Sequence, residues 1–311
     1  MAQLKALVDT LLSGVSSAYI PKGFIAESIL PSIKSKQKSG LLGKYGNSHL
    51  RLELNFKGGR GEYRRAETIS RESASFQIKG HGLEGLVTPD DYANVTDPYD
   101  AEKDETMGLT TALLIEKEYL VASALTSTAV MTQNVTLAGN QKFSDYLNSD
   151  PIARFSAMRA AVIAGCGMMP DTAMMDVLVW DKLRYHPQIL DALGFKENRP
   201  GGLSLSELAS AMGVEQVLLA QARYNSAKEG QADAFTSIWG KDIVFGVCPK
   251  KAEPYQVSLG YLVQPEGKAP RKVYKYAVNN PPESTGILTE DNYDALLSNV
   301  AAGYLIKDAI A

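Results

Sequence analysis

The chain has 311 residues, of which 45% are hydrophobic and 22% are charged, as is ordinary for a globular protein, and this composition argues against disorder. The formal net charge of -3 argues against a dedicated nucleic-acid binder, because such proteins carry a basic surface. No apolar run approaches the ~18 residues of a membrane span, and the first residues show no signal peptide, so we expect no membrane partner.

The residues that most often carry chemistry are few and scattered. Cys166 and Cys248 lie in apolar stretches without a CxxC pattern, which predicts buried free thiols rather than a disulfide or a zinc site. His49, His81 and His186 are far apart, so we expect no metal cluster. Phosphate-binding loops, dinucleotide-binding glycine motifs and the common hydrolase motifs are absent from the sequence. We therefore predict no catalytic residue, no cofactor and no metal.

The first forty residues predict a short helix followed by an arm. Residues 1–18 have apolar side chains at helical spacing, and Pro21 and Gly23 end this pattern. Residues 24–40 have little periodicity, so we expect an extended segment that packs against something else, such as a neighbouring subunit. The apolar positions of the predicted helix are Leu4, Val8, Leu11 and Leu12.

Residues 40–80 predict a long two-stranded ribbon. Apolar residues alternate from Leu50 to Phe56, a turn follows at residues 57–61, and a second extended run contains Phe76 and Ile78. An isolated ribbon is only marginally stable in water, which indicates docking on a partner. Glutamates are interleaved with the basic residues of its tip, which favours inter-subunit ion pairs over phosphate binding. These basic residues are Lys57, Arg60, Arg64, Arg65 and Arg71.

Residues 98–128 give the strongest helix signal. Asp100 is a plausible N-cap, and acidic residues follow it in the first turn, where the helix dipole favours negative charge. The predicted helix has about 25 residues and a length of ~38 Å, so it can serve as a structural spine. One apolar stripe is expected to face the core. It consists of Met107, Leu114, Val121 and Leu125.

The second half mixes helices and strands. A helix is predicted from Pro151 to Gly165, a buried strand from Met174 to Trp180, and then a short helix that ends at Pro187. We interpret His186 as a helix C-terminal cap or a packed side chain. Both tryptophans, Trp180 and Trp239, are expected to anchor the core.

Toward the C-terminus the pattern becomes mostly extended. A short helix is predicted over residues 204–212, with Ser204 as its cap and Glu207 completing a capping box. The tail, residues 293–306, fits either strand or helix. Grouped rather than alternating elements predict an α+β fold. Further strands are predicted within residues 133–147, 216–220, 241–247 and 255–280.

Several segments carry a family resemblance. The segment from Gly165 to Pro187 resembles a stretch of the major capsid proteins of tailed bacteriophages, where a glycine, Pro-Asn-Thr, a strand, tryptophan, leucine and His-Pro recur in that order. Asp171 stands where the family usually has asparagine. Residues 222–231 and 238–242 are similar to the Tyr-Asn-Thr-Ala…Gly-Gln and Ile-Trp-Gly-Lys blocks of that family.

Upstream, residues 81–87 and 97–100 also match, and the blocks keep the family order over roughly residues 75–250. Each block is weak alone, but together they are fairly specific. The positions that carry the motifs, which we expect to be structural, are Pro170, Trp180, His186, Pro187, Tyr224, Gly230, Trp239 and Gly240.

The resemblance implies the α+β fold of tailed-phage major capsid proteins. That fold has an N-terminal arm, a ribbon called the E-loop, a peripheral domain with a long spine helix, and an axial domain. The implied boundaries are residues 1–39 for the arm, 40–80 for the E-loop, 81–147 for the peripheral domain with its spine at about 100–128, 148–250 for the axial domain, and 251–311 for strands that return to the peripheral and axial domains.

The same resemblance implies a structural role without enzyme activity. Coat proteins of this type form pentamers and hexamers in an icosahedral shell around double-stranded DNA, in a virion assembled in the bacterial cytoplasm. The arm begins almost at Met1, so a separate scaffolding protein is expected, along with a portal, a decoration protein and non-specific contact with packaged DNA. The alternatives are an encapsulin-type compartment shell, an enzyme of unrecognised type, and a minor capsid or decoration protein.

Overall fold

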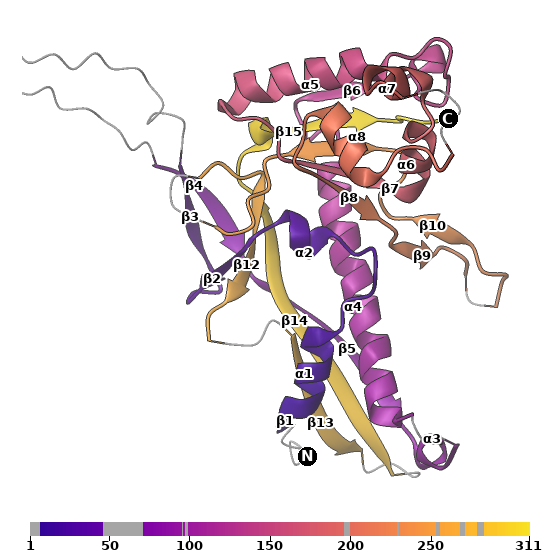
Figure 1. The fold of residues 1–311 in the computed structure, drawn as a ribbon. Coiled ribbons are helices and arrows are strands. Elements are labelled where there is room, and N and C mark those ends of the chain that lie inside the picture. Colours follow the sequence, from indigo (N-terminus) through magenta and orange to yellow (C-terminus); the bar gives the residue numbers. More distant parts are fainter. Residues whose placement is uncertain are drawn as a thin grey trace, which may run out of the picture.

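The fold has two parts that meet at the C-terminal end of one long helix (Figure 1). The first, which we call the spine unit, combines that helix with a six-stranded sheet and the N-terminal helices. The second, the five-stranded unit, packs several short helices on a five-stranded sheet. The computed structural model describes residues 7–45, 71–94, 96, 99–195, 200–228, 230–252, 256–267, 271–278 and 283–311.

The sheet of the spine unit is mainly antiparallel. Its longest strand, β14 (Ser284–Leu297), pairs with β13 and β5 along its first part and with β12 along its last part. Among the described strands of this sheet, only the β12–β2 pair is parallel. The other strands are β1 (Leu7–Asp9), β2 (Ser32–Ser35), β5 (Lys79–Val87), β12 (Gly260–Pro265) and β13 (Arg271–Val278).

The spine helix, α4 (Ala101–Leu125), confirms the strongest helix prediction. The Asp100 carboxylate accepts hydrogen bonds from the backbone N–H groups of Glu102 and Lys103, at 3.1 and 3.4 Å, and so caps the helix as expected. The helix packs on β5 and β14. The predicted apolar stripe is only partly right, because Met107 is half-buried and four buried positions on the inner face are polar. These are Thr106, Thr110, Lys117 and Glu118.

The N-terminal segment differs from its prediction. Helix α1 (Thr10–Ala18) begins only after β1, because the Asp9 carboxylate caps it at the Leu11 and Leu12 backbone N–H groups. Leu12 is buried but Leu11 is 65% exposed, so the expected apolar face is wrong at that position. The arm, predicted to be extended, contains the single-turn helix α2 (Ala26–Ile29), which packs on α4.

The predicted ribbon begins with an antiparallel pair, β3 (Ser39–Tyr45) and β4 (Arg71–Gln77). Ser39 lies opposite Gln77, and Tyr45 lies opposite Arg71. The ribbon leaves the body on the side opposite to the hairpin of β9 (Arg223–Asn225) and β10 (Phe235–Ser237) (Figure 1). The alternating run from Leu50 to Phe56 lies outside the described residues, so its prediction stays open.

The five-stranded unit has the strand order β6-β15-β11-β7-β8. The two outer pairs are parallel and the two inner pairs are antiparallel. Side chains alternate across the sheet, as strand geometry requires. Met175 and Phe245 face the helices, whereas Met174 and Val244 face the end of α4 and α2. The strands are β6 (Asn134–Thr136), β7 (Thr172–Asp176), β8 (Gln216–Ala220), β11 (Ile243–Gly246) and β15 (Gly303–Lys307).

The helices of this unit correct one boundary. The strand predicted to reach Trp180 ends at Asp176, because the Asp176 carboxylate accepts the Leu178 backbone N–H at 2.7 Å and starts helix α6 (Val177–Leu183). Pro187 does begin a new helix, α7 (Pro187–Ala192), besides ending the preceding segment, since proline suits the first helical position.

Two other helices agree with their predictions. Helix α5 (Pro151–Cys166) occupies the expected range, and its N-cap is Asp150. Helix α8 (Leu205–Met212) has the full capping box, in which Ser204 and Glu207 each accept a backbone hydrogen bond from the other. The remaining short helices are α3 (Pro89–Asn94), η2 (Gly139–Gln141) and η3 (Val300–Ala302).

The structure also settles the C-terminal tail, which is strand: β14 continues to Leu297, and β15 follows after η3. Both cysteines are buried and free, as predicted. Within the described ranges, no helix is both long and apolar enough to cross a membrane. The α+β class is confirmed, while the domain boundaries stay a prediction.

Candidate functional site

Four of the five predicted contact residues, Lys57, Arg60, Arg64 and Arg65, lie outside the described residues. The fifth, Arg71, is the first residue of β4, where its backbone pairs with Tyr45. Their proposed inter-subunit contacts therefore stay a prediction.

The motif residues from Pro170 to Pro187 pack against other side chains of the five-stranded unit. Pro170 is buried, and Trp180 is half-buried with the Arg184 guanidinium 4.3 Å from its ring centre. His186 is fully buried, with its Nε2 atom 2.9 Å from the Ser149 hydroxyl. The packed side chain is confirmed, but the C-terminal cap is wrong, because His186 directly precedes α7. Burial lowers the His186 pKa, although the nearby Asp150 charge opposes this.

The later motif residues surround the β9–β10 hairpin. The Tyr224 ring, on β9, meets the edge of the Tyr119 ring from α4 at 6.0 Å between centres. Gly230 and Gly240 have φ angles of +82° and +61°, which favour glycine at both turns. Trp239 is only 1% exposed and is a core anchor, as predicted.

Trp239 binds Glu118, a buried carboxylate on α4 that the sequence analysis did not identify as a site residue. Its indole Nε1–H donates to the Glu118 carboxylate at 2.7 Å. The same carboxylate accepts the backbone N–H of Ala26 at 2.8 Å and that of Ile25 at 3.1 Å. Glu118 therefore joins three segments: the spine helix, the start of α2 and the loop between β10 and β11, which contains Trp239. Burial raises the Glu118 pKa, and these donated hydrogen bonds oppose the rise.

One residue earlier on α4, Lys117 forms a buried charge cluster. Its Nζ atom lies 2.8 Å from a Glu27 oxygen on α2 and 2.5 Å from an Asp291 oxygen on β14. The ammonium also sits 4.6 Å from the Tyr293 ring centre. Arg271, on β13, reaches the same Glu27 oxygen at 3.4 Å. Two cations and two carboxylates therefore share one interior site.

The site shifts the pKa values of its two carboxyl groups in opposite directions. Burial raises the Asp291 pKa, and Lys117 and Arg271 only partly oppose it. Glu27 is partly exposed; burial acts to raise its pKa, but Lys117 and Arg271 together outweigh burial and lower it. Relative to its ordinary behaviour, the site therefore favours the charged form of Glu27 and the neutral form of Asp291.

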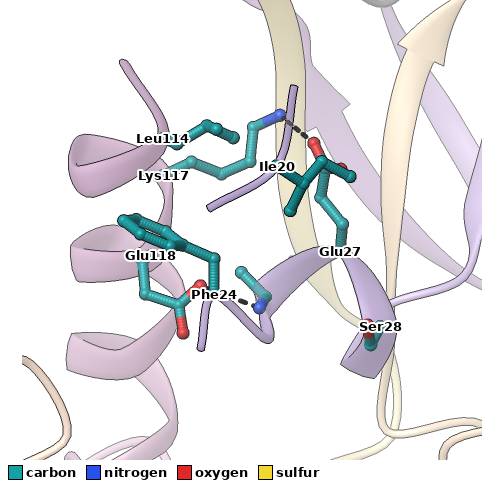
Figure 2. Close-up of a pocket in the computed structure, with 8 residues that line it drawn as sticks. Ile20, Phe24, Glu27, Ser28, Leu114, Lys117 and Glu118 are labelled. Atoms are coloured by element: carbon teal, nitrogen blue, oxygen red, sulfur yellow. Dashed lines mark hydrogen bonds and ion pairs between the residues drawn. The ribbon is translucent and has the colours of Figure 1, made fainter. Parts of the chain in front are cut away.

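A small cavity of about 40 Å³ lies beside the cluster, between α2 and α4. Figure 2 shows Lys117 reaching from α4 to Glu27, and Glu118 reaching the backbone at the start of α2. Such a cavity has room for water. Its lining residues are Ile20, Phe24, Ala26, Glu27, Ser28, Leu114, Lys117 and Glu118.

A sequence signal for this site exists in hindsight. Leu114 and Val121 define the apolar stripe, and Lys117 and Glu118 fall between them at helical spacing. Charged residues on the buried face of a helix are rarely found without partners. Within the ranges that the structure describes, no group of three or more His, Cys, Asp or Glu side chains is placed to hold a metal ion.

Comparisons with known proteins agree with the sequence motifs. The major capsid protein of Burkholderia phage BcepMu is 24% identical over 269 residues, which cover 84% of this chain and 84% of that protein. The major capsid protein of Pseudomonas phage JBD67 is 23% identical over 246 residues, or 76% of each. No protein-family model matches the chain.

Solved structures give the same answer for the fold. A phage-related protein of Bordetella bronchiseptica RB50 superposes with a TM-score of 0.75 at 23% identity, over 98% of both chains. The capsid structure of Cyanophage P-SCSP1u gives a TM-score of 0.56 at 14% identity, over 89% of this chain and 85% of that one. The chain thus has the tailed-phage major capsid protein fold and is related in sequence to phage major capsid proteins.

Proposed function

We propose that this chain is a major capsid subunit that assembles as pentamers and hexamers into an icosahedral head enclosing double-stranded DNA. The observation that carries the proposal is the similarity to a phage major capsid protein over 84% of both chains. In the same proposal the chain has no enzyme activity, and its five domain ranges are those given by the family resemblance.

The shape of the subunit supports ring formation. A ring of five or six subunits uses two different surfaces of each subunit, which face its two neighbours. The β3–β4 ribbon and the β9–β10 hairpin project on opposite sides of the body (Figure 1). Each carries a large apolar side chain in solvent, since Leu41 is 71% and Phe235 67% exposed. Such side chains are well placed for contacts with a neighbouring copy.

The proposed partners follow from this role. They are further copies of the chain, a separate scaffolding protein, a portal and a decoration protein, with non-specific contact to packaged DNA. The proposed location is the virion, after assembly in the host cytoplasm.

Negative-stain electron microscopy of the purified chain tests the proposal, with the chain alone and with a scaffolding protein encoded beside it. We expect closed shells, or rings of five and six subunits. A stable monomer or dimer under both conditions would contradict it.

The basic ribbon residues allow a sharper test. Reversing Arg64 and Arg65 to glutamate should impair shell assembly through lost inter-subunit ion pairs, while circular dichroism shows a folded subunit. The matched control reverses the exposed pair Lys250 and Lys251, which changes the net charge equally. Normal shells from the Arg64/Arg65 variant would refute the contact.

A further inference from the structure

The Lys117 cluster brings an amine and a carboxyl group into reacting distance. Lys117 Nζ lies 2.5 Å from Asp291 Oδ2, and each of the two side chains is only 1% exposed. Glu27 Oε1 lies 2.8 Å from the same nitrogen. The three residues come from α4, β14 and α2, so they are brought together only by the tertiary fold.

The surroundings of Asp291 suit a neutral group better than an ion. Apart from the Lys117 contact, neither Asp291 oxygen has a hydrogen-bond partner among the described residues. A buried carboxylate without donors is costly, so burial favours the uncharged form. Arg271 meanwhile compensates the charge of Glu27. A proton moved from Lys117 to Asp291 therefore leaves a neutral amine beside a neutral carboxylic acid, with the remaining ion pair intact.

We propose that Lys117 and Asp291 join in an intramolecular amide bond. The Lys117 Nζ lone pair attacks Cγ of the protonated Asp291 carboxyl, and a new N–C bond forms. The Glu27 carboxylate accepts a proton from this nitrogen and returns it to the departing hydroxyl. The C–OH bond breaks and one water molecule leaves, so the step balances without any oxidant, reductant or cofactor.

Geometry favours this reaction over the same reaction in solution. Groups held in contact in a fixed arrangement react as if at very high concentration. The adjacent cavity of about 40 Å³, lined by both Glu27 and Lys117, can accept the released water. The reaction occurs once per chain, so it is compatible with a non-enzymatic role, and it does not depend on the shell proposal.

The bond would tie the spine helix to the central strand of its sheet. Among the described residues, the apolar cluster beside the first half of the helix is small and consists of Leu12, Val87, Val273 and Ile287, whereas the C-terminal end of the helix packs in a larger cluster. A covalent joint restricts the unfolded chain and so stabilises the folded one, as other cross-links do.

Mass spectrometry of the full-length purified chain tests the proposal without any mutation. We expect an intact mass lower than the sequence mass by one water, and a branched tryptic peptide that contains both Lys117 and Asp291. A chain of full sequence mass that yields the two peptides separately would overturn the proposal.

Three variants locate the bond and the role of Glu27. Lys117→Arg keeps the positive charge but cannot form this amide, so we expect its full sequence mass. A water loss that persists in Lys117→Arg would overturn the assignment. Asp291→Asn should give the wild-type product by losing ammonia instead of water. Glu27→Gln should slow bond formation by roughly 100-fold, and an unchanged rate would overturn the proton-transfer role of Glu27.

Discussion

The two units of the molecule are stabilised by different chemistry. The five-stranded unit has one large apolar cluster in which α5, α7 and α8 pack on the sheet. Around the middle of the spine helix, by contrast, the buried side chains are largely polar or charged and are held by hydrogen bonds and ion pairs. They include Ser16, Thr106, Thr110, Lys117, Arg271 and Asp291.

The two kinds of interior respond differently to substitution. Apolar burial is non-directional and tolerates small shifts, whereas a buried polar network depends on every partner being present. In the spine unit, Ser16 Oγ meets Thr110 Oγ1 at 2.8 Å and Ser13 Oγ accepts the Val273 N–H at 3.0 Å, so α1 is joined to both α4 and β13 through hydroxyls. We expect this buried hydrogen-bond network to favour one arrangement of α1 against α4 and β13.

Truncation of a core phenylalanine in the five-stranded unit should destabilise the chain most. Phe155 is fully buried on α5, and its ring meets those of Phe143 and Phe245 at 5.8 and 6.0 Å between centres. Phe155→Ala should lower the free energy of unfolding by about 3–5 kcal/mol, because it removes apolar contacts and leaves a cavity. Denaturant titration followed by fluorescence measures the loss. The control is Leu147→Ala, at a position that is 91% exposed, where we expect little change.

Loss of the Glu118 carboxylate should also destabilise the folded chain. Glu118→Leu has a similar volume, but it leaves the Trp239 indole N–H and two backbone N–H groups of the arm buried without an acceptor. Each of the three orphaned donors costs about 1–3 kcal/mol, and removal of the buried carboxylate offsets part of that cost, so we expect a loss near the lower end, roughly 3 kcal/mol in the free energy of unfolding.

The matched control for Glu118 lies two residues away on the same helix. Glu116 pairs with His81 at 2.8 Å, but its side chain is 47% exposed, so Glu116→Leu should cost below about 1 kcal/mol. Equal losses for the two variants would show that the buried hydrogen bonds of Glu118 add nothing beyond a surface pair.

The same contrast explains what could be predicted from the sequence. Periodicity and capping residues located α4, α5 and α8, because Asp100, Pro151 and Ser204 act locally and the apolar faces repeat regularly. Local patterns could not locate the Glu27–Lys117–Asp291 cluster, whose members are far apart in the chain. The strand that ends at Asp176 was predicted too long, because the capping carboxylate outweighed the β-favouring valines that follow.

The five-stranded unit also contains a buried titratable group, His186, whose effect on stability depends on pH. His186 is fully buried there, the Tyr146 ring edge lies against it at 5.3 Å between centres, and its Nδ1 atom has no hydrogen-bond partner among the described residues. Burial lowers the His186 pKa, with only the Asp150 charge opposing. The folded chain therefore takes up a proton less readily at this residue than the unfolded chain does.

This difference fixes the sign of a pH effect. Above the ordinary histidine pKa of about 6.5 both states are neutral at His186, and no penalty arises. As the pH falls below that value the unfolded chain gains a proton first, so the folded state loses stability until the lowered folded-state pKa is passed. His186→Gln removes this group. Between pH 7 and pH 5 the free energy of unfolding should therefore fall less steeply for the variant than for the wild type, whatever their absolute difference. Parallel profiles would mean that the apolar unit accommodates a charged His186 as readily as water does.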